Sequence, residues 1–216
     1  SSPLIKNCEI YHHAASGIIV RQGGPYIIGN DIHHNTAPTH GGGIYAYTND
    51  IILVQSNKIH DNKADGDGGG IYAYGYMNTS TIHVEDNEIK NNEATGNGGG
   101  VYLSRSSAVS NRIEENVAKA AGGGVYSTFG LVDGNRITKN QAAQGGGVFT
   151  EHNSSITRNY VNANKALSSF GGGVYINFWG TSIENEKFAG NTVTDNSCPS
   201  PEDNGGVYVI GYLVFE

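Results

Sequence analysis

The sequence predicts an all-β fold, a right-handed parallel β-helix (solenoid) of about eight coils, and two observations lead to this prediction. The first is a repeated phrase in which Asn-x-(Ile/Val)-x-x-Asn-x-Ala precedes Gly-Gly-Gly-(Ile/Val)-aromatic, as in residues 57–64 and 68–72. The second is composition, because 32 glycines among 216 residues and few apolar runs leave no stretch of helical periodicity. A repeat of this length is typical of a solenoid, in which each coil buries apolar side chains only against its neighbours.

The coils are counted from the central Ile or Val of the asparagine phrase. This residue occurs as Ile10, Ile32, Ile59, Ile89, Ile113, Ile137, Val161 and Val193. The intervals of 22 to 32 residues suit three short strands and three turns, and they are too long for a hexapeptide left-handed helix. Equivalent residues then stack at the inter-strand spacing of about 4.8 Å, so each column of the repeat becomes a ladder along the axis. We expect residues 1–216 to form a single domain and to be an excerpt of a longer chain.

Two asparagine columns and one glycine column have structural explanations. Stacked Asn amides hydrogen-bond from coil to coil, and Asn tolerates the left-handed backbone of tight turns, so the columns two before and three after the anchor predict ladders. The three glycines predict a turn with positive φ followed by close backbone approach. A phosphate cradle is excluded because it requires a strand-to-helix junction and a Lys after the glycines.

An aromatic column follows the glycines. Adjacent strand residues point to opposite faces, and the β-branched neighbour suits the interior, so we expect the aromatics to face outward as an exposed apolar stripe. Such a stripe would stack on the sugar faces of an extended polysaccharide. The alternative is that the rings pack on each other, are covered by loops or point inward. The candidate ligand-binding residues are Tyr45, Tyr47, Tyr72, Tyr74, Tyr102, Tyr126, Phe149, Tyr175 and Tyr208, with Tyr76 widening the stripe in the early coils.

Histidines are concentrated in the first three coils. In register, His33, His34, His60 and Asp61 fall on neighbouring coils a few Å apart, an arrangement suited to proton transfer near neutral pH or to a transition metal. Solvated turn residues are the alternative. We therefore assign no catalytic residue and keep these four as candidates.

A second polar cluster precedes the glycines. His40, Asp67 and Asn97 occupy one column, with Asp65 two residues before Asp67. Carboxylate and amide oxygens suit Ca²⁺, but fewer than the six or more oxygens that this ion prefers are identifiable, so polar turn residues are the alternative. The pattern requires no cofactor, and we keep these four residues as candidate ligands for Ca²⁺.

Charge and hydropathy restrict the partners. The net charge of −7 and the absence of a basic cluster exclude nucleic acid, because phosphate backbones are repelled. No apolar segment approaches the roughly 20 residues of a membrane helix, so we expect no membrane insertion in this segment.

The repeat Asn-x-Ile-x-x-Asn-x-Ala-x-Gly-Gly-Gly-(Ile/Val)-Tyr resembles right-handed parallel β-helix proteins of the pectin lyase-like superfamily, and its glycine-rich phrase is similar to repeats of polymorphic outer-membrane adhesins. The resemblance implies an extracellular or cell-surface protein that binds polysaccharides or mediates adhesion. The superfamily's enzymes include pectate lyases, polygalacturonases, alginate lyases and uronan epimerases. None of the motifs Trp-Ile-Asp-His, Arg-x-Pro-x-x-Arg, Asp-Asp with Gly-His-Gly, or Asp-Pro-His occurs, so no catalytic residue is carried over.

The leading functional hypothesis is a non-catalytic, secreted or cell-surface β-helix that binds polysaccharide or a cell-surface glycan, or mediates adhesion, through the aromatic column. One alternative is a polysaccharide lyase, hydrolase or epimerase acting on uronan-type glycans through the early His/Asp cluster or a Ca²⁺-assisted site. The other is a purely structural segment of an extracellular fibre, with head-to-tail or lateral self-association.

Overall fold

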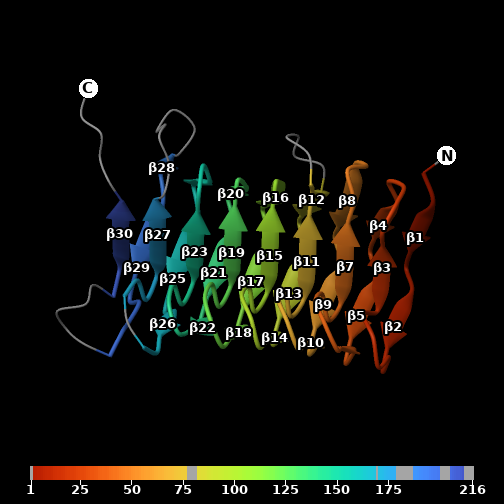
Figure 1. Cartoon of the computed structure of the whole chain (residues 1–216), viewed down its shortest axis with the longest axis horizontal. Helices are drawn as coiled ribbons and strands as arrows, with labels where there is room; N and C mark the ends of the chain where they lie inside the picture. Colours follow the sequence, from red (N-terminus) through yellow and green to blue (C-terminus); the bar gives the residue numbers. More distant parts are fainter. Residues whose placement is uncertain (1, 77–81, 169, 179–186, 200–204, 212–216) are drawn as a thin grey trace.

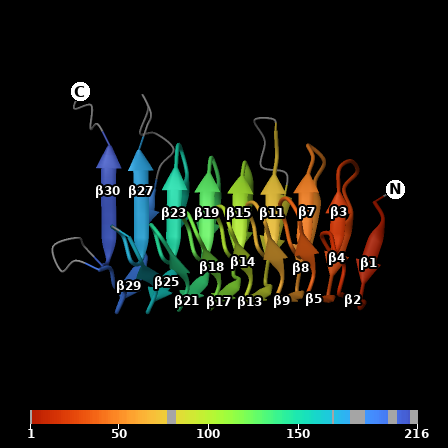
Figure 2. The same ribbon diagram turned by 60° about the horizontal axis from the view of Figure 1, so that its bottom comes forward.

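The chain forms an elongated solenoid built entirely of short parallel strands (Figure 1). The structure is a computed structural model, and it describes residues 2–76, 82–168, 170–178, 187–199 and 205–211. The two ends of the chain lie at opposite ends of the solenoid, and strands of successive coils lie side by side between them. Figure 2 shows two rows of such strands, one from each of two sheets.

Four sheets run along the axis, and each coil visits them in the order A, B, D and C. Sheet A contains β1 (Leu4–Lys6), β4 (Tyr26–Ile28), β8 (Ile52–Gln55), β12 (Ile82–Glu85), β16 (Ser106–Val109), β20 (Leu131–Asp133), β24 (Ser155–Thr157) and β28 (Phe188–Ala189). Sheet B contains β2 (Glu9–Tyr11), β5 (Asp31–His33), β9 (Lys58–His60), β13 (Glu88–Lys90), β17 (Arg112–Glu114), β21 (Arg136–Thr138), β25 (Tyr160–Asn162) and β29 (Thr192–Thr194).

The other two sheets complete the coil. Sheet D contains β6 (Thr36–Ala37), β10 (Lys63–Ala64), β14 (Glu93–Ala94), β18 (Val117–Ala118), β22 (Gln141–Ala142) and β26 (Lys165–Ala166). Sheet C contains β3 (Ile18–Val20), β7 (Ile44–Tyr47), β11 (Ile71–Tyr74), β15 (Val101–Ser104), β19 (Val125–Thr128), β23 (Val148–Glu151), β27 (Val174–Phe178) and β30 (Val207–Gly211).

This architecture confirms the predicted all-β parallel solenoid. The predicted pairing of columns is also confirmed, since Ile32 pairs with Ile59 and Tyr72 pairs with Tyr102. The coil count differs slightly from the expected eight. In the described residues, six coils carry a strand in all four sheets, whereas the first and last coils lack the two-residue strand of sheet D.

The core is a stack of aliphatic side chains that point inward from sheets A, B and C. The anchor column is fully buried from Ile32 to Val161, as are the inward residues of β8 and β12. Burying one Ile or Val side chain stabilises the fold by about 1.5–3 kcal/mol. Alternation of buried and more exposed residues, as in β4, β5 and β8, keeps one face of each strand in this core.

Two corners of the coil have constant length. In the coils that the structure describes, two residues connect each sheet A strand to its sheet B strand, and two residues connect sheet B to sheet D. The first of the two residues usually has a positive φ, as in Ser56 (56°) and Asp61 (53°). The second is the ladder asparagine in six successive coils, so the left-handed turn and the ladder are built from the same dipeptide.

The ladder asparagines of the inner coils are saturated with hydrogen bonds. The Nδ2 group of Asn57 donates to Oδ1 of Asn87 at 3.0 Å and to the carbonyl of Ile27 at 2.9 Å. Its Oδ1 accepts from the backbone N–H and from Nδ2 of Asn30, at 2.9 and 3.0 Å. Because a buried amide is costly unless it is paired, this complete pairing confirms the structural role predicted for the columns.

The glycine triplets also confirm their predicted role. The first glycine has a positive φ, which is 68° at Gly68. A Cβ on the second, Gly69, would collide with the carbonyl of Gly99, and a Cβ on the third, Gly70, would lie 2.7 Å from the carbonyl oxygen of Gly100. Only glycine therefore permits the close approach of successive coils at this corner.

Candidate functional site

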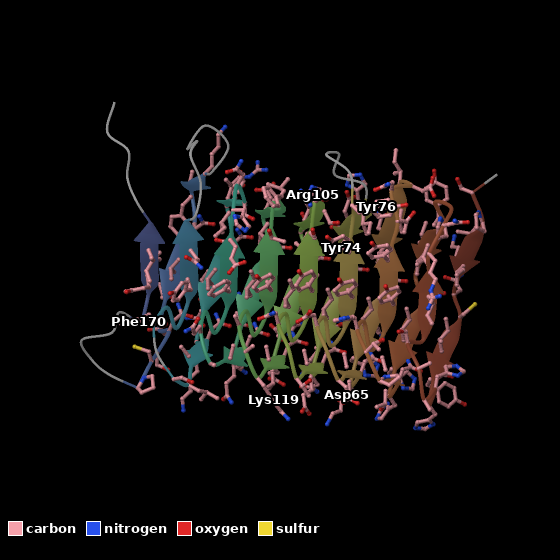
Figure 3. All side chains as sticks on the ribbon, in the orientation of Figure 1. Asp65, Tyr74, Tyr76, Arg105, Lys119 and Phe170 are labelled. Carbon is pink, nitrogen blue, oxygen red and sulfur yellow. The ribbon has the colours of Figure 1, made fainter. Side chains whose placement is uncertain are left out.

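The aromatic column forms a continuous stack on the outer face of sheet C, where a row of rings crosses the strands (Figure 3). Ring centroids of successive coils are separated by 4.7 to 5.4 Å from Tyr45 to Tyr208. The planes are within 21° of parallel as far as Tyr175. The ring positions belong to the strands of sheet C and lie outside the aliphatic core, so the outward direction predicted for them is confirmed.

The predicted exposure of this column is wrong. Tyr72, Tyr126, Phe149 and Tyr175 are buried, with 5 to 9 % of their surface exposed. Tyr45, Tyr102 and Tyr208 are half-buried. The reason is the coil spacing of about 4.8 Å, which brings ring faces into contact so that each ring covers its neighbours. The faces that would stack on sugars are therefore occupied by other rings of the ladder.

Burial holds the hydroxyl groups of three ladder tyrosines in their neutral form. Burial raises the pKa of Tyr72 and Tyr102 well above the ordinary tyrosine value. Burial also raises the pKa of Tyr126, and a hydrogen bond from its hydroxyl to Oε2 of Glu151, 2.7 Å long, raises it further. These three tyrosines do not ionise near neutral pH, and Tyr126 acts as a hydrogen-bond donor.

Residues outside the predicted set cover the ladder at its edge. The ring of His40 stacks on Tyr72 at 4.7 Å, and the ring of Phe170 stacks on Tyr208 at 4.2 Å. Both come from the turns that precede the glycine triplets, and Figure 3 labels Phe170 at this edge. The sequence pattern missed the covering role because the turn column varies in residue type from coil to coil.

At the other margin of sheet C, three neighbouring tyrosines form what we call the tyrosine patch: Tyr47, Tyr74 and Tyr76. Tyr47 is 40 % exposed and Tyr76 is 49 % exposed, while Tyr74 is half-buried. The ring of Tyr47 stacks on both Tyr74 and Tyr76, each at 5.2 Å. Figure 3 shows Tyr74 and Tyr76 at the upper end of sheet C, beyond the row of ladder rings.

A short polar turn holds the patch in place. Oδ1 of Asn49 accepts the backbone N–H of Tyr76 at 3.1 Å. The carboxylate of Asp50 accepts the N–H of Gly23 at 2.6 Å and the hydroxyl of Thr48 at 3.2 Å. Sequence reasoning missed this turn, although Thr48-Asn49-Asp50 departs from the repeat and is rich in turn-forming residues, which is the signal that could have found it.

The residues predicted to bind calcium hydrogen-bond to one another along the axis. Oδ1 of Asp67 accepts the backbone N–H of Asn97 at 2.7 Å and its Nδ2 at 3.1 Å, and Nδ1 of His40 accepts the N–H of Asp67 at 2.9 Å. Asp65, labelled at the lower edge in Figure 3, accepts the Thr95 hydroxyl through its backbone carbonyl. Within the described residues, no group of three His, Cys, Asp or Glu side chains is arranged to hold a metal ion. The calcium site stays a prediction.

The early His/Asp cluster lies on the outer face of sheet B and its adjacent corner, and the predicted proximity is confirmed. His33 and His60 stack with centroids 4.9 Å apart, and Nδ1 of His33 lies 2.8 Å from Nδ1 of His34. Nδ1 of His60 lies 2.7 Å from Oδ2 of Asp61, and its Nε2 lies 2.9 Å from Oδ1 of Asp31. Asp31 was missed because the equivalent residues of the other coils include both acidic and basic side chains, a pattern typical of a solvent-exposed face.

A groove of about 250 Å³ adjoins His60 and gives this cluster a cavity. Its lining residues are Lys58, His60, Asp61, Glu88, Lys90 and Asn91. Lys90 lies 3.5 Å from Glu115, whereas both ring nitrogens of His60 are already within hydrogen-bonding distance of carboxylates. A ligand that used the imidazole of His60 would have to displace one of these carboxylates.

The four-sheet coil, the amide ladders and the glycine corners together define a parallel β-solenoid. Residues 1–130, more than half of the chain, match the sequence model of the right-handed β-helix region, and the chain belongs to this family. This is consistent with the resemblance to the pectin lyase-like superfamily. No curated protein and no solved structure matches the chain. The described part of the chain contains no helix long and apolar enough to cross a membrane.

Proposed function

We propose that this β-helix is an extracellular or cell-surface protein that binds a carbohydrate chain without cleaving it, and that the tyrosine patch is its contact surface. The observation that carries the proposal is the exposure of Tyr47 and Tyr76 at the margin of a ladder whose other rings are mostly buried. Because Tyr47 stacks on Tyr74 and Tyr76, the patch meets a sugar with its exposed ring edges and its hydroxyl groups.

The buried ladder supports this proposal by holding the patch rigid. Tyr47 lies 6.5 Å from Tyr45, and Tyr74 lies 6.1 Å from Tyr72, with nearly parallel rings in both pairs. A contact surface that is already ordered loses little conformational freedom on binding. The ladder therefore acts as the support of the patch.

The polar turn supplies the second requirement of a carbohydrate site. Sugar hydroxyls need donors and acceptors beside the apolar contact. Asn49 and Asp50 hold amide and carboxylate groups next to the patch, where Asn49 bonds the backbone of Tyr76. Asp50 is exposed and Asn49 is half-buried.

Affinity electrophoresis in gels containing soluble polysaccharides tests the proposal. Replacing both Tyr47 and Tyr76 by Ala removes two ring contacts worth about 0.5–1.5 kcal/mol each, so retention weakens about fivefold or more. The matched control is Tyr26→Ala, which removes a ring of similar exposure, 44 %, from sheet A. Equal retention of the double variant and the control would refute the tyrosine patch as the contact surface.

A second candidate function is favoured by the groove beside His60. Its two lysines and its imidazole suit a polysaccharide lyase, hydrolase or epimerase acting on acidic sugars, which needs a proton-transfer group and a cation for the sugar carboxylate. Incubation with uronans, followed by assay of unsaturated or reducing ends, measures this activity. The product must disappear in His60→Ala and persist in His83→Ala, a control on sheet A whose ring bonds Ser107 at 3.0 Å.

A further inference from the structure

The charges around the tyrosine patch restrict what it can bind. We infer that its ligand is an uncharged glycan chain and that polyuronates and sulfated chains are excluded from this face. The inference rests on the proposed function, because it names the class of carbohydrate that the same surface takes.

The two side-chain columns on the outer face of sheet C consist almost entirely of neutral residues. The first column is the aromatic ladder. The second column, in the described residues, continues from Tyr47 and Tyr74 through Ser104, Thr128, Glu151, Asn177 and Ile210. Glu151 is the one charged side chain in these columns from β7 to β30.

The margins of this face carry charges of both signs. Asp50 lies in the turn after β7, and Asp67 lies in the turn before β11. Arg21 directly follows β3, so it precedes Tyr47 in the second column. Arg105 follows β15, but its guanidinium lies over the ring of Phe129 at 4.5 Å. Together with Glu151, these residues give three carboxylates and two guanidinium groups, one of which is engaged by an aromatic ring. Asp65 and Lys119, in the turns before β11 and β19, add one charge of each sign.

A polyanionic glycan carries a charge on every sugar or every second sugar, at spacings of about 5–10 Å, comparable to the screening length in physiological salt of about 8 Å. Binding such a chain along the solenoid would require a column of cations at the coil spacing. Sheet B and its corner towards sheet D carry such residues, among them Lys58, Lys90, Arg112, Arg136 and Lys139. Four of these five cations pair with Glu114 or Glu115. The strands of sheet C from β7 to β30 carry no cation, so this face offers an anionic chain no matching column.

The test compares neutral and anionic polysaccharides on the same protein. The probes are a soluble β-glucan, xylan and galactomannan as neutral chains, and polygalacturonate, alginate and a sulfated galactan as anionic chains. Affinity gels are run at 50 and 500 mM NaCl with the wild type, Tyr47→Ala/Tyr76→Ala, Arg21→Gln and Tyr26→Ala. Thermal melting in each case verifies that the variants fold.

We expect at least one neutral chain to retard the wild type with a dissociation constant that changes less than twofold between the two salt concentrations. The double tyrosine variant should lose fivefold or more, and Arg21→Gln should change retention less than twofold. Retardation by an anionic chain that depends on the tyrosines and falls tenfold in high salt would overturn this inference while leaving the tyrosine patch as a glycan site. Absence of any tyrosine-dependent retardation would overturn the proposed function itself, and the inference with it.

Discussion

The hydroxyl of Tyr126 donates a hydrogen bond of 2.7 Å to Glu151, one coil further along the solenoid. The tyrosine ring is buried in the ladder, and the carboxylate lies at its outer margin. This bond ties the aromatic stack to the polar rim of sheet C, and it needs a protonated tyrosine. Ionisation of the ladder is therefore coupled to folding.

Stability should fall steeply in alkaline solution. Burial raises the pKa of Tyr72, Tyr102 and Tyr126 above the unfolded value of about 10, so the native state holds protons that the unfolded state releases. The stabilisation by these protonated hydroxyls is fully present below pH 10 and is lost as the pH rises through and beyond that value. Urea denaturation midpoints at pH 8, 9, 10 and 11 measure the loss.

The control for the alkaline effect is Tyr72→Phe/Tyr102→Phe, which removes two ionising groups and keeps the rings, as the native Phe149 does in the same column. Its midpoint should decline less above pH 10 than that of the wild type. If both proteins decline equally, the alkaline loss comes from groups other than these ladder tyrosines.

Removing one rung of an amide ladder should be strongly destabilising. In Asn62→Ala, Asn35 and Asn92 lose their amide partner and the carbonyl of Ile32 loses a donor. Leaving such buried polar groups unpaired costs about 1–3 kcal/mol each, so a total loss of about 3 kcal/mol or more is expected in chemical denaturation. Asn162→Ala removes an amide on the outer face of sheet B and should cost about 0.5 kcal/mol or less. A similar loss in both variants would contradict the ladder's special role.

The third glycine of the triplet should tolerate a methyl group in one coil and reject it in another. In Gly70→Ala the new Cβ would meet the carbonyl of Gly100 at 2.7 Å and the side chain of Asn92 at 3.0 Å. Gly206 occupies the same column in the last described coil, and a Cβ there has no atom within 4 Å. Thermal melting should show a loss of several degrees or failure to fold for Gly70→Ala, and a change of about two degrees or less for Gly206→Ala. Equal effects would show that crowding is not what selects glycine.

A substitution in the buried ladder should lower stability without weakening glycan binding by the tyrosine patch. Phe149→Ala creates a cavity between Tyr126 and Tyr175. It should lower the free energy of unfolding by about 3–5 kcal/mol, which is the usual cost of replacing a buried Phe by Ala. Glycan retention, measured well below the lowered melting temperature, should stay within twofold of wild type because the ring lies three coils from Tyr76. Loss of retention in folded Phe149→Ala would place the binding surface on the ladder instead.

Periodicity allowed the fold to be predicted in detail, because every column of the repeat has a single physical reason. The anchor of Ile59, the amide of Asn62 and the close approach at Gly70 are each required in coil after coil, so the requirement is visible as a repeated letter. The exposure of Tyr72 was predicted wrongly. The position of a residue in the repeat indicates whether its side chain points inward or outward, but it does not indicate how much of that side chain is covered by the equivalent rings of neighbouring coils.

The candidate site was only partly predictable, because its residues do not recur from coil to coil. Tyr47, His33 and His60 stood out as residue types, but their partners Asn49 and Asp31 belong to segments where the repeat is broken or mixed. A feature that occurs once has no column to reveal it. Its contacts depend on loop geometry that the repeat does not determine.

The two-residue corners have the same length in every described coil and form a fixed frame, whereas the connections from sheet C to sheet A form a margin that varies in length. Because the ladder asparagines sit in those corners, an insertion there would shift the register of an entire coil. The connections from sheet C to sheet A carry no amide ladder, and those that the structure describes in full range from a single residue, Arg105, to the five residues between β3 and β4. Tyr76 and Asn49 both lie in these connections. Natural variation or engineering can thus exchange the loops at this margin one coil at a time, while the frame that carries them stays unchanged.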